Sequence, residues 1–88
     1  MESYIERFRL LADLLAERRI HAEVLGRGNG SFLYARQRPR TLEASEIGTG
    51  SDEGKVRVEF RIRGLGAPRE EIYPDYAPAI EAMLKWLT

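Results

Sequence analysis

The chain has 88 residues, of which 43% are hydrophobic and 32% charged, as expected for a single globular domain spanning residues 1–88. The absence of cysteine and the single histidine exclude disulfide frameworks, cysteine-based metal sites and histidine-rich metal clusters. Basic and acidic residues, 14 of each, cancel to a net charge of +0, which argues against a dedicated nucleic-acid-binding protein. We see neither an apolar leader nor a run of about 18 apolar residues, so we expect a cytoplasmic protein without a membrane segment.

Residues 2–19 have the apolar spacing of an amphipathic helix. Ser3 stands where an N-cap is needed, and Glu6 three residues later would complete a capping box. Leu10 and Leu14 fall on the flank of the main apolar stripe, so the apolar arc is wider than one sheet face requires. These two leucines either line the edge of the core or contact another subunit.

The next two segments predict a β-hairpin. Residues 20–25 and 31–37 alternate between apolar and polar side chains, and a glycine-rich turn at residues 26–30 separates them. This glycine run is not a phosphate-binding loop, because neither the required lysine nor a helix follows it. The two faces of the second strand are ambiguous from the sequence.

A weaker third strand is predicted at residues 41–47, with Leu42 and Ala44 pointing inward. We expect the Arg-Pro-Arg segment at residues 38–40 to interrupt the pairing, because proline has no backbone N–H to donate. The polar, glycine-rich residues 48–54 form a loop.

Residues 55–63 give the clearest strand in the chain. Four apolar side chains alternate strictly with charged ones between Gly54 and Gly64, which indicates a strand with one face buried. The apolar residues are Val56, Val58, Phe60 and Ile62, and the charged ones are Arg57, Glu59, Arg61 and Arg63.

The C-terminal part predicts an irregular segment and a second helix. Residues 65–74 show no regular pattern beyond one helical turn at residues 68–72, and Asp75 is the natural N-cap of a helix that ends at Leu87. The element order α-β-β-β-β-α predicts an α+β fold. We expect a four-stranded antiparallel meander with both helices on one face and residues 55–63 at a sheet edge.

Catalytic chemistry finds little support in the sequence. We expect His21 and Glu23 to point away from each other, and nothing holds the remaining carboxylates at a catalytic separation. No serine–histidine–aspartate or metal-ligand spacing occurs. We therefore predict a non-enzymatic protein without cofactor or metal.

The favoured interpretation is a protein–protein interaction module, expected to be a homodimer, with an inhibitor, immunity, chaperone-like or adaptor role. Exposed leucines and aromatic residues are typical interface anchors, although they could equally cap the core of a small domain. The candidate interface consists of Leu10, Leu14, Tyr73, Tyr76 and Trp86.

The alternative is a protein that binds single-stranded nucleic acid through the sheet. Aromatic and arginine side chains interleaved on an open sheet face can stack bases and contact phosphates. The candidate residues are Phe32, Tyr34, Arg36, Arg57, Arg61 and Arg63. This interpretation requires Leu33 and Ala35 to point inward. Nearby glutamates allow the simpler explanation of a solvated face with cross-strand ion pairs.

Overall fold

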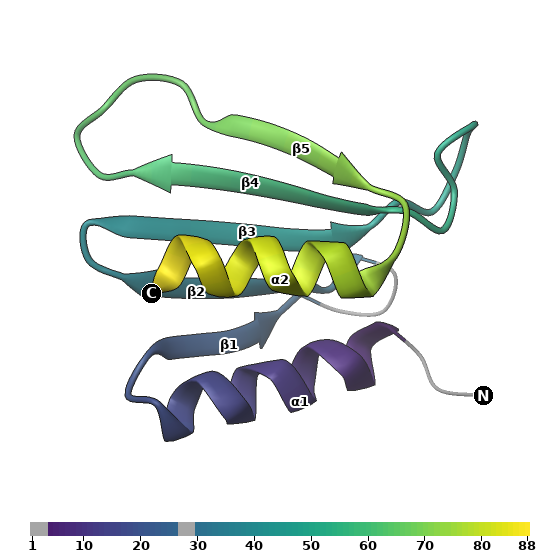
Figure 1. Ribbon diagram of the computed structural model, residues 1–88. Coiled ribbons are helices and arrows are strands. Elements are labelled where there is room, and N and C mark those ends of the chain that lie inside the picture. Colours follow the sequence, from purple (N-terminus) through teal and green to yellow (C-terminus); the bar gives the residue numbers. More distant parts are fainter. Residues whose placement is uncertain (1–3, 27–29) are drawn as a thin grey trace.

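The protein has an α+β fold, as predicted, with a helix at each end of the chain (Figure 1). The computed structural model describes residues 4–26 and 30–88. Its elements are α1 (Tyr4–Glu17), β1 (His21–Leu25), β2 (Phe32–Gln37), β3 (Arg40–Glu46), β4 (Val56–Ile62), β5 (Arg69–Tyr73) and α2 (Tyr76–Leu87). The predicted cap at Ser3 lies outside the described residues, as does part of the predicted turn at residues 26–30.

The sheet has five strands in the order β1-β2-β3-β4-β5, with every neighbouring pair antiparallel. The meander is therefore confirmed, but the prediction of four strands is wrong. The additional strand β5 lies where an irregular segment with one helical turn was expected. Its sequence, Arg-Glu-Glu-Ile-Tyr, lacks apolar alternation, and its extended conformation comes from pairing with β4.

Strand β4 is an interior strand, paired with both β3 and β5, so its predicted position at the sheet edge is also wrong. The segment at residues 38–40 does not interrupt the sheet. Gln37 pairs with Arg40, which leaves Arg38 and Pro39 as a two-residue turn between β2 and β3. Proline is tolerated there because turn residues do not donate to the ladder.

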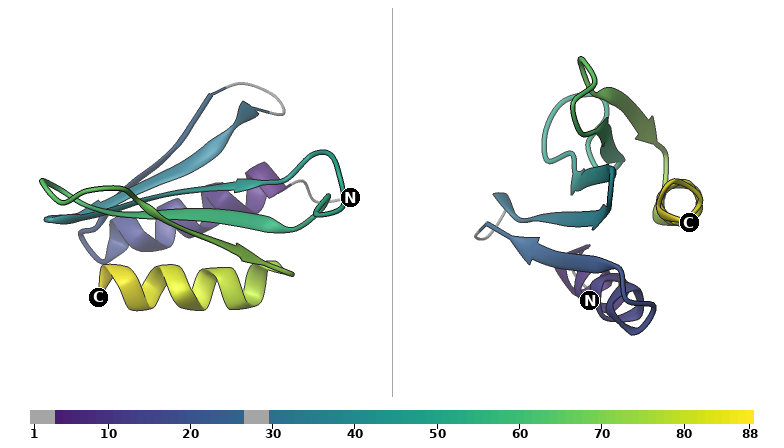
Figure 2. Two further views of the ribbon diagram at one scale, coloured as in Figure 1. Left: turned by 90° about the horizontal axis from the view of Figure 1, so that it is seen from above. Right: turned by 90° about the vertical axis from the view of Figure 1, so that its left-hand side faces the viewer.

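Both helices cover the same face of the sheet (Figure 2). Helix α1 packs on β1 and β2, and α2 packs on β3, β4 and β5. One apolar core lies between the helices and the sheet, and Leu42 and Ala44 point into it as predicted. The opposite face of the sheet is covered by no helix of the described chain (Figure 2).

Helix α2 begins as the sequence indicates. The carboxylate of Asp75 accepts a hydrogen bond of 2.7 Å from the Tyr76 backbone N–H, and Pro78 lies in the first turn, where its missing N–H costs nothing. At the other end, the backbone N–H of Thr88 donates to the Leu84 carbonyl at 3.0 Å. The helix therefore has a defined start and end, which sets the position of Trp86 against the sheet.

Candidate binding surfaces

The helical side of the protein exposes two large apolar side chains on α1. Leu10 and Leu14 retain 57% and 58% of their accessible surface. Leu14 also borders a cavity of about 220 Å³ between the helices. The other residues that line this cavity are Leu11, Leu15, Glu17, Arg18, Ile80 and Leu84. Leu14 thus continues the lining of this cavity onto the surface of α1, and Leu10 lies about one turn before it on the same helix.

Tyr76, another predicted interface residue, has contacts within the protein. Its hydroxyl donates to a Glu46 carboxylate oxygen at 2.5 Å. Its ring meets Phe8 edge-on at 5.9 Å, and the guanidinium of Arg7 lies 4.8 Å from its ring centre. These contacts connect α2 to α1 and to the end of β3, so the side chain is half-buried.

Trp86 is half-buried against the sheet by α2. Its ring meets Phe60 edge-on at 5.3 Å, and its indole N–H donates to the Thr41 carbonyl at 3.0 Å. Arg40 donates to the Trp86 carbonyl at 3.1 Å and lies over the indole ring. Arg69 covers the Phe60 ring at 4.7 Å. The tryptophan therefore packs against the edge of the core where α2 covers β3, β4 and β5.

Tyr73 lies on β5 and packs against the core. Burial raises the pKa of its hydroxyl, and the neighbouring Glu71 carboxylate adds to the rise, whereas Arg69 opposes it. The structure thus separates the predicted interface residues into two groups. Leu10 and Leu14 are exposed on α1, while Tyr73, Tyr76 and Trp86 contribute to packing.

The open face of the sheet carries the aromatic and arginine residues that the sequence suggested. Leu33 and Ala35 are fully buried on the core side of β2, so Phe32, Tyr34 and Arg36 lie on the open face. The register places Arg36 beside Thr41, which in turn lies beside Arg61. The strand orientation on which the nucleic-acid interpretation depends is therefore present.

A row of acidic side chains crosses the same open face. Cross-strand pairing aligns Glu23, Tyr34, Glu43, Glu59 and Glu70 on five neighbouring strands. Carboxylates directly opposite each other destabilise a sheet. The ion pairs of Glu59 with Arg61 and of Glu70 with Arg57 offset part of the repulsion between these carboxylates. The sequence could not reveal this row, because it depends on the register between strands.

The ion pairs on the open face are close but exposed. Arg61 Nη2 lies 3.2 Å from Glu59 Oε2, and Arg57 Nε lies 3.7 Å from Glu70 Oε1. The sequence led us to expect ion pairs across strands. Arg61 and Glu59 instead lie on the same strand, β4, whereas Arg57 does pair across strands, with a residue of the unexpected strand β5. Since solvent screens such pairs, each stabilises the fold only slightly.

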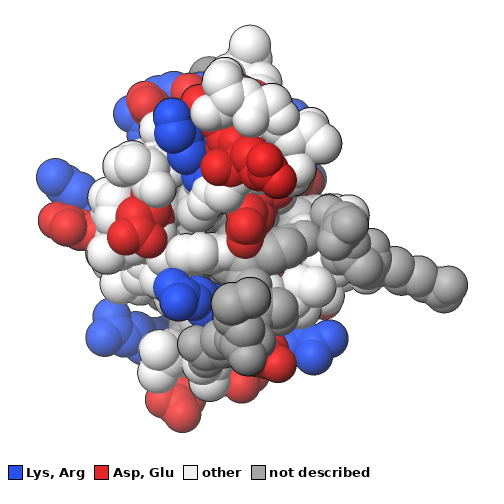
Figure 3. Space-filling model, turned by 90° about the vertical axis from the view of Figure 1, so that its right-hand side faces the viewer, with Lys and Arg blue, Asp and Glu red and all other residues white. Residues whose placement is uncertain are grey.

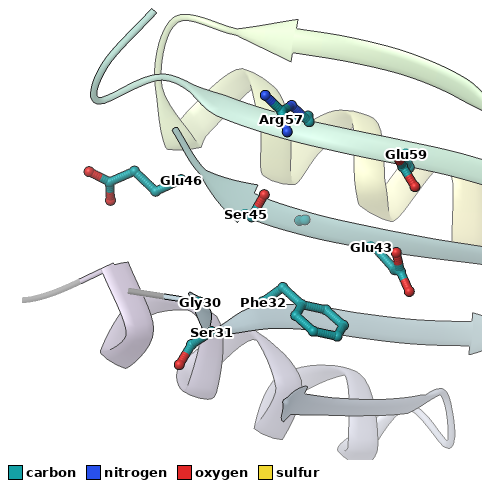
Figure 4. Close-up of a pocket in the computed structure, with 9 residues that line it drawn as sticks. Gly30, Ser31, Phe32, Glu43, Ser45, Glu46, Arg57 and Glu59 are labelled. Carbon is teal, nitrogen blue, oxygen red and sulfur yellow. The ribbon is translucent and has the colours of Figure 1, made fainter. Parts of the chain in front are cut away.

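One shallow cavity of about 330 Å³ lies over this part of the sheet. Figure 4 shows Phe32 from β2, Glu43 and Ser45 from β3, and Arg57 and Glu59 from β4 around it. Three glutamates and one arginine line it, so its net charge is negative and disfavours an anion. A second cavity, lined by Arg36, Arg61 and Arg63, lies toward the other end of the same face.

His21 and Glu23 lie on the same face, contrary to the expectation from the sequence. Their atoms Nε2 and Oε1 are 3.6 Å apart, because residues two apart in a strand point the same way. The His21 ring also meets Tyr34 edge-on at 6.0 Å. Both side chains of the ion pair are about half exposed, so no enclosed catalytic pocket surrounds them.

Within residues 4–26 and 30–88, no group of three or more acidic, histidine or cysteine side chains is arranged to hold a metal ion. None of the described helices is long and apolar enough to cross a membrane. Comparisons with protein-family models, with curated proteins and with solved structures give no match.

Proposed function

We propose that this protein is a non-enzymatic protein–protein interaction module and that it forms a homodimer through its helical side. The observation that carries the proposal is the exposure of Leu10 and Leu14 on α1, where Leu14 also lines the apolar cavity between α1 and α2. Burying a leucine that is otherwise exposed contributes about 1.5–3 kcal/mol. A small domain gains much of its available stability by covering such a surface.

The contacts of Tyr76 and Trp86 within the protein reduce the proposed interface to the two exposed leucines of α1. Tyr76 and Trp86 are held by hydrogen bonds and ring contacts inside the protein, so their packing serves the fold first. Leu10 and Leu14 make the proposed contact with the second copy. An inhibitor, immunity, chaperone-like or adaptor role is compatible with such a surface, and the identity of a further partner defines which role applies.

Sedimentation at micromolar concentration tests the homodimer. We expect the Leu10→Ser/Leu14→Ser double variant to sediment as a monomer with an unchanged circular dichroism spectrum, because both side chains are exposed in the single chain. Leu65→Ser is the matched control, since Leu65 is 67% exposed on a distant loop. A monomeric parent protein, or a dimer that the double variant leaves intact, would contradict the proposal.

The orientation of β2 favours a second candidate function, the binding of single-stranded nucleic acid by the open face. Phe32 and Tyr34 offer stacking surfaces beside Arg36, Arg57, Arg61 and Arg63. The acidic row of Glu43, Glu59 and Glu70 opposes a polyanion on the same face, which is why we rank this function second.

Fluorescence anisotropy with a mixed-sequence single-stranded oligonucleotide tests the second candidate. Binding should weaken with salt at a logarithmic slope of about −0.7 per phosphate contact. Tyr34→Ala should reduce affinity, because a stacked base contributes about 1–3 kcal/mol. Absence of binding at low salt would rule this function out.

A further inference from the structure

The cavity at the β2–β3 turn differs from the other surfaces of the protein. It has a volume of about 400 Å³, and residues 64–66 of the β4–β5 loop form one wall. Four arginines, Arg36, Arg38, Arg61 and Arg63, line it together with Tyr34 and Thr41. They come from β2, the β2–β3 turn and the end of β4, so the fold brings them together from two separate parts of the sequence.

The charge of this cavity is strongly positive. No aspartate or glutamate of the described chain lines it. Among the described residues, Arg61 is the only one of the four with an ion-pair partner, Glu59 at 3.2 Å. Arg36, Arg38 and Arg63 have no acidic partner there. Guanidinium groups gathered without counter-charges repel one another, and an anion between them would remove this cost.

A neighbouring cavity strengthens the positive potential. It has a volume of about 470 Å³, shares Arg38 and Pro39 with the first, and adds Arg18 and Arg40. Arg40 is already held by the Trp86 carbonyl and ring, so it contributes charge rather than a free donor. The first cavity has the larger number of arginines, four against the three of its neighbour, and Arg38 lines both.

The chemistry of the lining selects the kind of anion. Arginine forks match the oxygens of phosphate, and each can donate two parallel hydrogen bonds. A single carboxylate has two oxygens, too few for several forks, whereas a terminal phosphate group offers three non-bridging oxygens and a diphosphate offers more. Thr41 adds a hydroxyl and Tyr34 an aromatic ring at the edge of the cavity.

We propose that this arginine-lined cavity binds a phosphate group. The inference goes beyond the helix-mediated homodimer and depends neither on that dimer nor on single-strand binding, because phosphate alone should occupy the cavity. The phosphate can belong to a small phosphorylated molecule or to a nucleic-acid strand. Both offer anionic phosphate oxygens to the arginines, three non-bridging ones on a terminal phosphate and two on a backbone phosphodiester.

Thermal unfolding of the full chain with increasing pyrophosphate, at constant ionic strength, provides the first test. The unfolding midpoint should rise and then saturate, since a ligand that binds only the folded state stabilises it. The Arg36→Gln/Arg63→Gln double variant should weaken the apparent Kd by about tenfold or more, as expected for lost charge-assisted hydrogen bonds. The same variant should unfold near the parent midpoint without pyrophosphate.

The matched control is Arg9→Gln/Arg57→Gln, which removes the same charge from α1 and from the other part of the open face. This variant should bind pyrophosphate like the parent. Equal weakening in both double variants would show general charge attraction and overturn the proposal. No saturable rise in the parent protein would overturn it as well, while sedimentation of the same samples reports on the homodimer separately.

Comparison of three ligands identifies the source of the phosphate. Equal affinity for inorganic phosphate and a mononucleotide would support a site for the phosphate group itself. Tighter binding of the mononucleotide, lost in Tyr34→Ala, would support a nucleotide stacked on that ring. Tightest binding of a single-stranded oligonucleotide, again reduced by the Arg36→Gln/Arg63→Gln variant, would support a nucleic-acid phosphate.

Discussion

At the scale of single residues, Phe60 is the side chain through which β4, β5 and α2 pack together. Its ring is 2% exposed, contacts Trp86 edge-on and lies beneath the guanidinium of Arg69. The alternation in residues 55–63 already predicted its burial. Its covering by Arg69 could not be predicted, because that residue belongs to a strand with no apolar alternation.

Phe60→Ala should therefore lower the free energy of unfolding by about 3–5 kcal/mol, as for other buried phenylalanines. Urea unfolding followed by circular dichroism measures the change. Leu65→Ala, at an exposed loop position, is the control and should change stability by less than about 0.5 kcal/mol. A loss below about 1 kcal/mol for Phe60→Ala would contradict the core described above.

At the scale of elements, the acidic row shows how strand register creates chemistry that no single segment carries. Glu43 lies directly opposite Glu59, and Glu59 lies opposite Glu70. Each strand contributes a single glutamate to these pairs, so no strand by itself reveals the alignment. Their alignment depends on the loop between β3 and β4 and on the loop between β4 and β5, which join the strands at these two registers.

Glu43→Gln should stabilise the fold by about 0.2–1 kcal/mol at low salt, because it removes the charge facing Glu59. High salt should abolish the gain, since exposed charges are screened. Urea unfolding at the two salt concentrations measures both effects. Glu53→Gln, in the β3–β4 loop, is the control, and an equal gain there would show that net charge rather than the row is responsible.

Across the whole molecule, charge is unevenly distributed despite a net charge of +0. Arginines gather around the β2–β3 turn and the β4–β5 loop. Figure 3 shows the opposite end, where acidic side chains lie among basic ones. The acidic residues near the ends of elements on this side are Glu46, Asp52, Glu53 and Asp75. A protein that is neutral overall can therefore present a basic surface to a partner.

This separation of charge predicts retention on a cation-exchange resin near neutral pH, although the net charge is zero. The Arg36→Gln/Arg63→Gln variant should elute at lower salt than the Arg9→Gln/Arg57→Gln variant, even though both carry the same net charge. Elution of the two variants at the same salt concentration would show that net charge, and not its distribution, controls binding to the resin.

The sequence by itself determined the α+β class, the terminal helices, the helix start at Asp75 and the burial of the apolar side of β4. These features depend on hydrophobic periodicity and helix capping, which involve only residues close together in the sequence. Only the tertiary structure decided the fifth strand, the outward orientation of Phe32 and Tyr34, the acidic row and the arginine-lined cavity. The physical reason is that each depends on strand pairing between distant segments. Strand β5 is extended because β4 offers it an edge, and Arg36 and Arg63 line one cavity because β3 holds β2 and β4 on either side of it in the sheet.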